Sequence, residues 1–179
     1  TPDSVVLLGG NFGTGVSSPI VIGYIEGKGT LVSVTIPVLD VGDKNASDIT
    51  FSWASSGGTP ISSATANADG TLNAQIDGTG LTITISRPGY LPLVIKNYSP
   101  GADITQYISQ FEKGAGDVDG DTVINMVDIS KLIDAYDKTQ SYIVNADFNR
   151  DGVINMLDLS TLISSYDRNT GNNMTFSVT

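Results

Sequence analysis

Residues 117–138 read DVDGDTVINMVDISKLIDAYDK, and residues 147–168 read DFNRDGVINMLDLSTLISSYDR, thirty positions further along the chain. The two stretches share 12 of 22 residues at matching positions. Each begins with an acidic segment and continues into a segment whose apolar residues recur at the spacing of an amphipathic helix. The sequence therefore predicts a duplicated loop–helix unit near the C-terminus.

Oxygen-bearing residues recur in each acidic segment at the spacing that calcium requires. A calcium ion takes about six to eight oxygen ligands, which a loop of about twelve residues offers from positions 1, 3, 5, 7, 9 and 12, with the backbone carbonyl serving at position 7. The predicted ligands are Asp117, Asp119, Asp121, Val123, Asn125 and Asp128 in the first loop, and Asp147, Asn149, Asp151, Val153, Asn155 and Asp158 in the second. We therefore predict two calcium ions.

A simpler alternative is that these segments are polar turns that cap two helices. Asp and Asn do favour turns and helix N-caps, but a cap uses one such residue. Here the side-chain ligands recur at the same offsets in both segments. This repetition favours calcium.

Positions 6 and 8 of the loops carry further predictions. Gly152 stands at position 6, where a sharp turn favours a residue without a Cβ atom, whereas the first loop has the β-branched Thr122 there. We therefore predict that the first site is strained and binds calcium more weakly than the second. Ile124 and Ile154, at position 8, are expected to point away from the metal and to pair the two loops across a short β-bridge.

Two features distinguish these units from an ordinary EF-hand: position 12 is Asp, and the residues before the first loop, FEKGAG, do not predict a helix. A calcium loop followed by a helix, twice, with Ile-Asn at positions 8 and 9, resembles a dockerin of the bacterial cellulosome. The resemblance covers roughly residues 114–170. It implies a secreted, calcium-dependent module that binds a cohesin domain and takes part in cellulose and polysaccharide degradation.

The same resemblance implies which residues contact the partner, namely those at positions 10, 11, 17, 18 and 22 of each repeat. These are Met126, Val127, Ile133, Asp134 and Lys138, and then Met156, Leu157, Ile163, Ser164 and Arg168. The apolar pair at positions 10 and 11 resembles type II dockerins, which anchor scaffoldins to the cell surface. Burial of the methionines in the core is the alternative. The likeness of the repeats suggests, as a hypothesis, that the partner binds in two orientations.

Other apolar residues of the two helical segments are expected in the core. They are Ile129, Leu132 and Tyr136, with their counterparts Leu159, Leu162 and Tyr166. A unit of about sixty residues needs most of its apolar side chains inside, together with metal ions that hold it.

The N-terminal half has the pattern of an all-β domain. Short β-type runs separated by turn residues predict strands, at 5–8, 20–26, 30–39, 49–55, 71–76, 81–87 and 91–97. This spacing favours an antiparallel sandwich. The stretch at 64–98, ATANADGTLNAQIDGTGLTITISRPGYLPLVIKN, resembles the X-modules of scaffoldins, which are Ig-like sandwiches that pack on the dockerin that follows them.

The expected fold class is thus two domains, an Ig-like X-module over residues 1–112 and a small α domain of two calcium loop–helix repeats over 113–179. Residues 1–18 are either linker or a first strand, and a chain that begins at Thr1 is expected to be a segment of a longer protein. The joining region 101–116 has two interpretations. Its apolar residues fit one helical face, whereas the resemblance favours a terminal strand.

Composition excludes several classes of function. The net charge of −10 argues against nucleic-acid binding, and no apolar run approaches a membrane span. The absence of His and Cys removes the usual catalytic bases and thiols, so we do not expect an enzyme. The alternative function is a carbohydrate-binding module in the N-terminal half, with Tyr24, Phe51, Trp53 and Tyr90 as a sugar-stacking platform.

Overall fold

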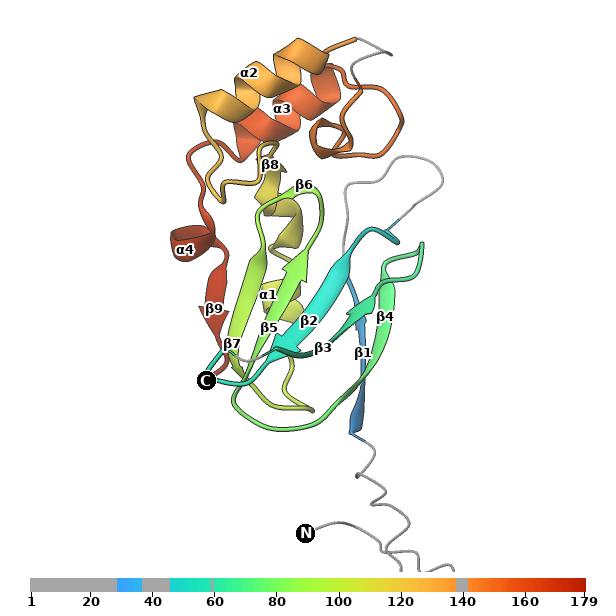
Figure 1. The fold of residues 1–179 in the computed structure, drawn as a ribbon, viewed down its shortest axis with the longest axis vertical. Coiled ribbons are helices and arrows are strands. Elements are labelled where there is room, and N and C mark those ends of the chain that lie inside the picture. The colour runs from blue at the N-terminus through green and yellow to red at the C-terminus, as the bar shows by residue number, and fades with distance from the viewer. Residues whose placement is uncertain (1–28, 37–45, 59, 138–141) are drawn as a thin grey trace, which may run out of the picture.

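The computed structural model describes residues 29–36, 46–58, 60–137 and 142–179 (Figure 1). Its strands are β1 (Thr30–Thr35), β2 (Thr50–Ala54), β3 (Pro60–Thr65), β4 (Thr71–Ile76), β5 (Leu81–Ser86), β6 (Gly89–Tyr90), β7 (Leu93–Tyr98), β8 (Ala115–Asp117) and β9 (Thr175–Ser177). Its helices are α1 (Thr105–Ile108), η1 (Phe111–Gly114), α2 (Met126–Ala135), η3 (Val144–Ala146), α3 (Met156–Ser164) and α4 (Thr170–Asn173). The strands predicted at 5–8 and 20–26, the 1–18 segment, Tyr24 and Lys138 lie outside the described residues.

A five-stranded sheet in the order β3-β2-β5-β7-β9 forms the body of the N-terminal region. Its strands pair antiparallel except for β7 and β9, which run parallel. Burial alternates along β5, where Leu81, Ile83 and Ile85 are buried and the residues between them are half-exposed. One face of the sheet therefore lies on the core, as the period of two in the sequence predicts.

A second sheet pairs β1 with β4, with Thr30 opposite Ile76 and Thr35 opposite Thr71. The buried side chains of both sheets belong to one continuous hydrophobic core. Phe51, Trp53 and Tyr90 are part of that core. The prediction of a sugar-stacking platform is therefore wrong for Phe51, Trp53 and Tyr90, because their faces are covered, and its fourth member, Tyr24, lies outside the described residues.

The joining segment is helical. Ile104, at the N-cap of α1, Ile108 of α1 and Phe111 of η1 are buried in the core. The helical interpretation is therefore confirmed in part, as two short helices in place of one continuous face, and the strand is confined to the end of the region. The chain becomes extended only at β8, which pairs antiparallel with β6. This pairing brings the first acidic loop directly to the edge of the β-domain.

Helices α2 and α3 lie side by side at the end of the molecule beyond β6 and β8 (Figure 1). Each begins with a capping box, in which Asn125 or Asn155 caps the helix and the Asp three residues later bonds back. Leu132 and Leu162 are fully buried, and Ile129, Tyr136 and Leu159 are half-buried. Tyr166, with 44% of its surface exposed, is not a core residue as expected.

The last residues return to the β-domain. After α4, strand β9 pairs in parallel with β7, and Val178 N–H donates to the Lys96 carbonyl at 2.9 Å. The Tyr107 ring of α1 packs on Phe176, and its hydroxyl donates to the Ser177 carbonyl at 3.1 Å. The helical unit is thus tied to the β-domain at both ends, by β8 and by β9. None of the helices described here has the length and apolar character needed to cross a bilayer.

Candidate metal and docking site

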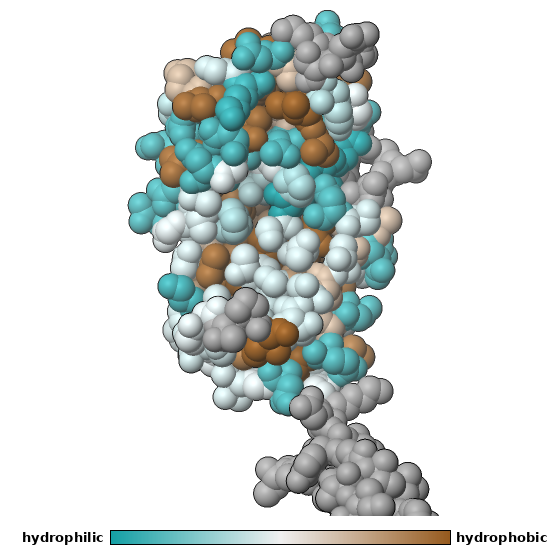
Figure 2. Space-filling model, viewed as in Figure 1, coloured by the Kyte–Doolittle hydropathy of each residue, from teal (hydrophilic) through white to brown (hydrophobic). Residues whose placement is uncertain are grey.

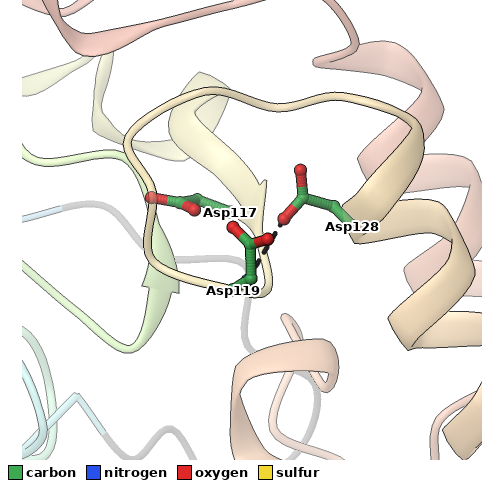
Figure 3. A group of neighbouring side chains, drawn as sticks. All are labelled: Asp117, Asp119 and Asp128. Carbon is green, nitrogen blue, oxygen red and sulfur yellow. Dashed lines mark hydrogen bonds between the residues drawn. The ribbon is translucent and has the colours of Figure 1, made fainter.

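The first acidic loop gathers three carboxylates around one point. Oxygen atoms of Asp117, Asp119 and Asp128 lie within 4.8 Å of one another (Figure 3). Backbone amides fix their orientation: Asp117 accepts from Gly120 N–H at 2.9 Å, and Asp128 accepts from Val118 N–H at 2.8 Å. Asp128 also accepts from Asn125 N–H at 2.8 Å, so this last carboxylate joins both ends of the loop.

The second loop repeats the arrangement. Asp147 accepts from Gly152 N–H at 2.9 Å, as Asp117 accepts from Thr122 N–H at 3.2 Å at the same position of the first loop. Asp158 accepts from Phe148 N–H at 2.8 Å and from Asn155 N–H at 3.0 Å. Asn149 stands where the first loop has a carboxylate, and its side-chain amide donates to Asp151 at 3.0 Å. The sequence repeat is therefore a repeat of hydrogen-bonding geometry as well.

Burying these carboxylates in their charged form costs free energy unless a cation compensates their charge. Asp128, Asp147 and Asp158 are almost completely buried. Burial, with smaller effects of Asp128 and Asp121, raises the pKa of Asp117 to about 6. Burial likewise raises the pKa of Asp158. Clustered buried carboxylates of this kind are normally paired with a cation or a metal ion.

The donor set fits calcium. Side-chain oxygens stand at positions 1, 3, 5, 9 and 12 of each loop, and the carbonyls of Val123 and Val153 stand at position 7. All of these donors are oxygen, and hard cations such as calcium select oxygen ligands. The residues present therefore suit a calcium ion in each loop.

Each loop has left-handed backbone at positions 4 and 6. In the first loop these are Gly120 and Thr122, with φ of 76° and 75°, and in the second they are Arg150 and Gly152, with φ of 56° and 87°. Each loop therefore combines one glycine with one residue for which this conformation is unfavourable. The sequence identified Thr122 but not Arg150.

Ile124 and Ile154 are buried, but they do not pair the loops as expected. Ile124 N–H donates to the Arg168 carbonyl at 2.8 Å, and Asp167 N–H donates back to Ile124 at 3.0 Å. Ile154 accepts from Asp137 N–H at 2.9 Å. Each loop is thus bonded to the segment that follows the helix of the other repeat.

Apolar side chains are exposed at matching places in the two repeats. Residues 121–130 and 151–160 follow the same order of buried and exposed positions. Six of the predicted partner-binding residues are large, apolar and exposed: Met126, Val127, Ile133, Met156, Leu157 and Ile163. Asp134 and Ser164 are exposed beside them, and Arg168 is half-buried. Figure 2 shows apolar side chains among hydrophilic ones at this helical end of the molecule.

An aromatic cluster joins the helical unit to the β-domain. Tyr90 stacks on Phe111 with ring centroids 5.3 Å apart and meets Phe148 edge-on at 6.2 Å. Its hydroxyl donates to the Phe148 carbonyl at 2.8 Å, in a buried position. Gly89 lies so close to η3 that a Cβ atom there would stand 2.2 Å from the Asn145 carbonyl oxygen.

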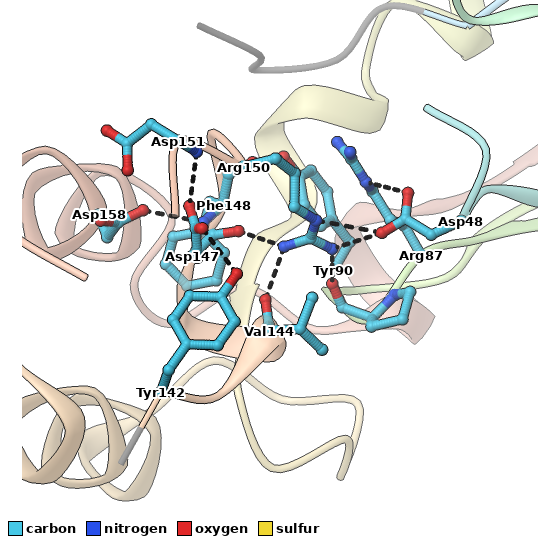
Figure 4. A network of polar contacts seen from close by, with 11 residues as sticks. Asp48, Arg87, Tyr90, Tyr142, Val144, Asp147, Phe148, Arg150, Asp151 and Asp158 are labelled. Atoms are coloured by element: carbon cyan, nitrogen blue, oxygen red, sulfur yellow. Dashed lines mark hydrogen bonds and ion pairs between the residues drawn. The ribbon is translucent and has the colours of Figure 1, made fainter. Parts of the chain in front are cut away.

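A polar network crosses the same junction (Figure 4). Asp48 of the β-domain lies between two arginines, Arg87 at 2.8 Å and Arg150 of the second loop at 2.8 Å. On the far side of the loop, the Tyr142 hydroxyl donates to Asp147 at 2.8 Å. Burial, and then this hydrogen bond, raise the pKa of Tyr142 to about 12, so it remains a donor.

Residues 115–165 match the family described as the dockerin type I domain. Residues 115–165 are a dockerin domain. The preceding β-domain and the dockerin together also match solved structures, whereas the curated proteins give no match.

Two of these structures are type II cohesin–X-dockerin complexes from Acetivibrio cellulolyticus. One, an N-terminal interface mutant, is 23% identical with a TM-score of 0.58, and the other, a C-terminal interface mutant, is 24% identical with a TM-score of 0.59. Each match covers 80% of this chain and 99% of the matched chain. The family description thus names type I and the structures type II. At these identities the structures establish a shared X-module–dockerin fold.

Sequence reasoning missed three residues that the structure places around the second loop of the dockerin. Arg150, Asp48 and Tyr142 contact the loop or each other but contribute no predicted ligand. The signal for Arg150 was present, because it replaces the glycine found at position 4 of the first loop. Asp48 gave no signal, since it lies 102 positions away from Arg150.

Proposed function

We propose that this chain is a calcium-dependent docking module whose dockerin binds a cohesin domain, with a type II cohesin as the expected partner. The observation that carries the proposal is the pair of matching exposed apolar groups on two helices, each beginning at an oxygen-lined loop. Calcium in each loop would hold the helices, and exposed apolar residues bordered by polar ones suit a binding hot spot.

The wider setting follows from the same proposal. The β-domain is an Ig-like X-module, the boundary between the modules lies near residue 112, and the dockerin consists of two calcium loop–helix repeats. The chain acts outside the cell, where it assembles a cellulosome or anchors it to the cell surface. It is a non-catalytic part of that assembly. The match to X-dockerin structures supports the module order, and their cohesin partner supports the partner chosen here.

The partner is tested by titrating the chain with a type II and a type I cohesin, in calcium and in a chelator, by isothermal titration calorimetry. We expect binding to the type II cohesin, and its loss in chelator. Failure to bind either cohesin in calcium would refute the docking function. Selective binding of the type I cohesin would refute the choice of partner.

The docking surface is tested by Met126→Asp and Met156→Asp, separately and together. Both side chains are exposed, at 60% and 62%, so a charge there need not disturb the fold. A matched control is Leu31→Asp, because Leu31 is 62% exposed but lies on β1 of the β-domain. The methionine variants should weaken binding at least about thirtyfold if these positions are hot spots, and the control should not. Very unequal effects of the two methionines would indicate one binding orientation in place of two.

A further inference from the structure

Arg150 occupies an unusual place in the second calcium loop. It stands at position 4 with φ of 56°, where the first loop has Gly120. A left-handed conformation is unfavourable for arginine and is retained only where surrounding contacts fix it. The contacts of Arg150 therefore indicate what holds this loop in shape.

The guanidinium of Arg150 bonds to both modules. Toward the dockerin it donates to the carbonyl of Val144 at 2.6 Å and to the carbonyl of Asp147, the residue at position 1 of the loop. Toward the β-domain it donates to the Pro88 carbonyl at 2.8 Å and to Asp48 Oδ2 at 2.8 and 3.1 Å. Only 8% of its side chain is exposed, so these contacts replace water as its solvation.

Asp48 supplies the negative charge in this arrangement. Its Oδ2 atom faces Arg150, and its Oδ1 atom accepts from Arg87 Nε at 2.8 Å. Without Asp48, a buried positive charge would remain next to a loop that binds a divalent cation, and the two would repel each other. Loss of Asp48 would also release the arginine that fixes position 4.

We propose that Asp48 of the β-domain is a positioning residue for the second calcium loop. By neutralising and orienting Arg150, it gives residues 147–158 their metal-binding shape only while the two modules are docked. The inference rests on the proposed calcium function and adds that Asp48 tunes the affinity of the second site and not of the first. Reciprocally, calcium in the second loop strengthens the contact between the modules.

The test measures calcium affinity at each loop separately, in the whole chain, by nuclear magnetic resonance. The amides of Thr122 and Gly152 serve as reporters, because each donates to the carboxylate at position 1 of its own loop. Asp48→Asn should weaken calcium binding at the second loop on the order of tenfold, as is usual when an outer partner of a metal site is lost, and leave the first loop unchanged. Asp48→Glu should restore part of the lost affinity.

Arg150→Gly provides the decisive background, because it copies position 4 of the first loop. In Arg150→Gly, the further change Asp48→Asn should leave the affinity of the second loop unchanged. The inference is wrong if Asp48→Asn still weakens calcium binding at the second loop in the Arg150→Gly background. It is also wrong if Asp48→Asn weakens both sites equally in the native background, because the substitution then acts by destabilising the whole fold. If both loops bind calcium and Asp48→Asn leaves the calcium affinity of the second loop unchanged, only this inference fails. If neither loop of the native chain binds calcium, the proposed function fails as well.

Discussion

Replacing Thr122 by glycine should stabilise the first loop. Thr122 has φ of 75°, a left-handed conformation that is unfavourable for a β-branched residue. Its side chain is exposed, whereas its amide donates to Asp117 at 3.2 Å. Thr122→Gly keeps this hydrogen bond and removes the side chain that makes the backbone conformation unfavourable.

The size of the effect is the difference between two terms. The left-handed conformation costs a residue with a Cβ atom about 1–2 kcal/mol, and a glycine costs about 0.5–1 kcal/mol more chain entropy on folding. The net gain in the free energy of unfolding is therefore about 0.7 kcal/mol, the middle of a range from about 0 to 1.5 kcal/mol. In a chain of 179 residues this corresponds to a rise in Tm of about 1–3 °C.

The assay is thermal unfolding in saturating calcium, with calorimetry of the two calcium sites beside it. Thr122→Ala is the matched control, because it removes the outer side-chain atoms but keeps the Cβ atom. It should therefore retain most of the backbone strain and raise the Tm by much less than Thr122→Gly. Gly152→Ala, at the same position of the second loop, should lose about as much as Thr122→Gly gains. The first site is expected to be the weaker one in the native chain and to approach the second in Thr122→Gly. An unchanged or lower Tm for Thr122→Gly would refute the reasoning.

Four further predictions concern the junction and the carboxylates. Tyr90→Phe keeps the ring contacts but removes the hydroxyl that donates to the buried Phe148 carbonyl. The free energy of unfolding, measured in urea, should therefore fall by about 1–3 kcal/mol, and a change below about 0.5 kcal/mol would contradict this. Gly89→Ala should destabilise the chain much more than Gly101→Ala, because both glycines have positive φ but only Gly89 faces a backbone atom, and equal losses of Tm would disprove the clash. Below pH 6, calcium binding at the first site should weaken about tenfold per pH unit, because a proton occupies Asp117. The stability of the calcium-free chain should depend on pH in the opposite way. The raised pKa of Asp117 in the folded state stabilises the fold at low pH, and this contribution is lost as the pH rises through about 6. Unfolding in chelator should therefore show a more stable chain at pH 5 than at pH 7, as far as Asp117 is concerned.

The sequence predicted what depends on local spacing. The ligand positions follow from alternation within twelve residues, and the structure gathers Asp117, Asp119 and Asp128 as that spacing requires. The strands at 49–55, 71–76 and 81–87 coincide with β2, β4 and β5, because alternating apolar residues define a buried face. Met126 and Met156 are exposed, as the resemblance to dockerins implied, and the alternative of burial in the core is wrong.

What the sequence did not predict depends on contacts between distant segments. Strand β3 has the polar sequence PISSAT at the edge of its sheet, so it lacks the apolar alternation that marks a central strand. Strand β9 exists because the end of the chain meets β7, roughly eighty positions earlier. The pairing expected between Ile124 and Ile154 failed for a related reason: the repeat suggested symmetry between the loops, but each loop bonds to the segment after the other helix.

The proposed docking surface belongs to helices that are connected to the β-domain by two strand pairings. Strand β8 leads from the β-domain into the first loop, and the chain returns through α4 to β9 after the second helix. Between these ties, the Tyr90 cluster and Arg150 hold the second loop against the β-domain. Ordering an interface in advance lowers the entropy that binding costs, so helices fixed in this way favour tighter association than the same helices on a free loop–helix unit. The β-domain can therefore strengthen docking without touching the partner, by holding the loops from which both helices begin.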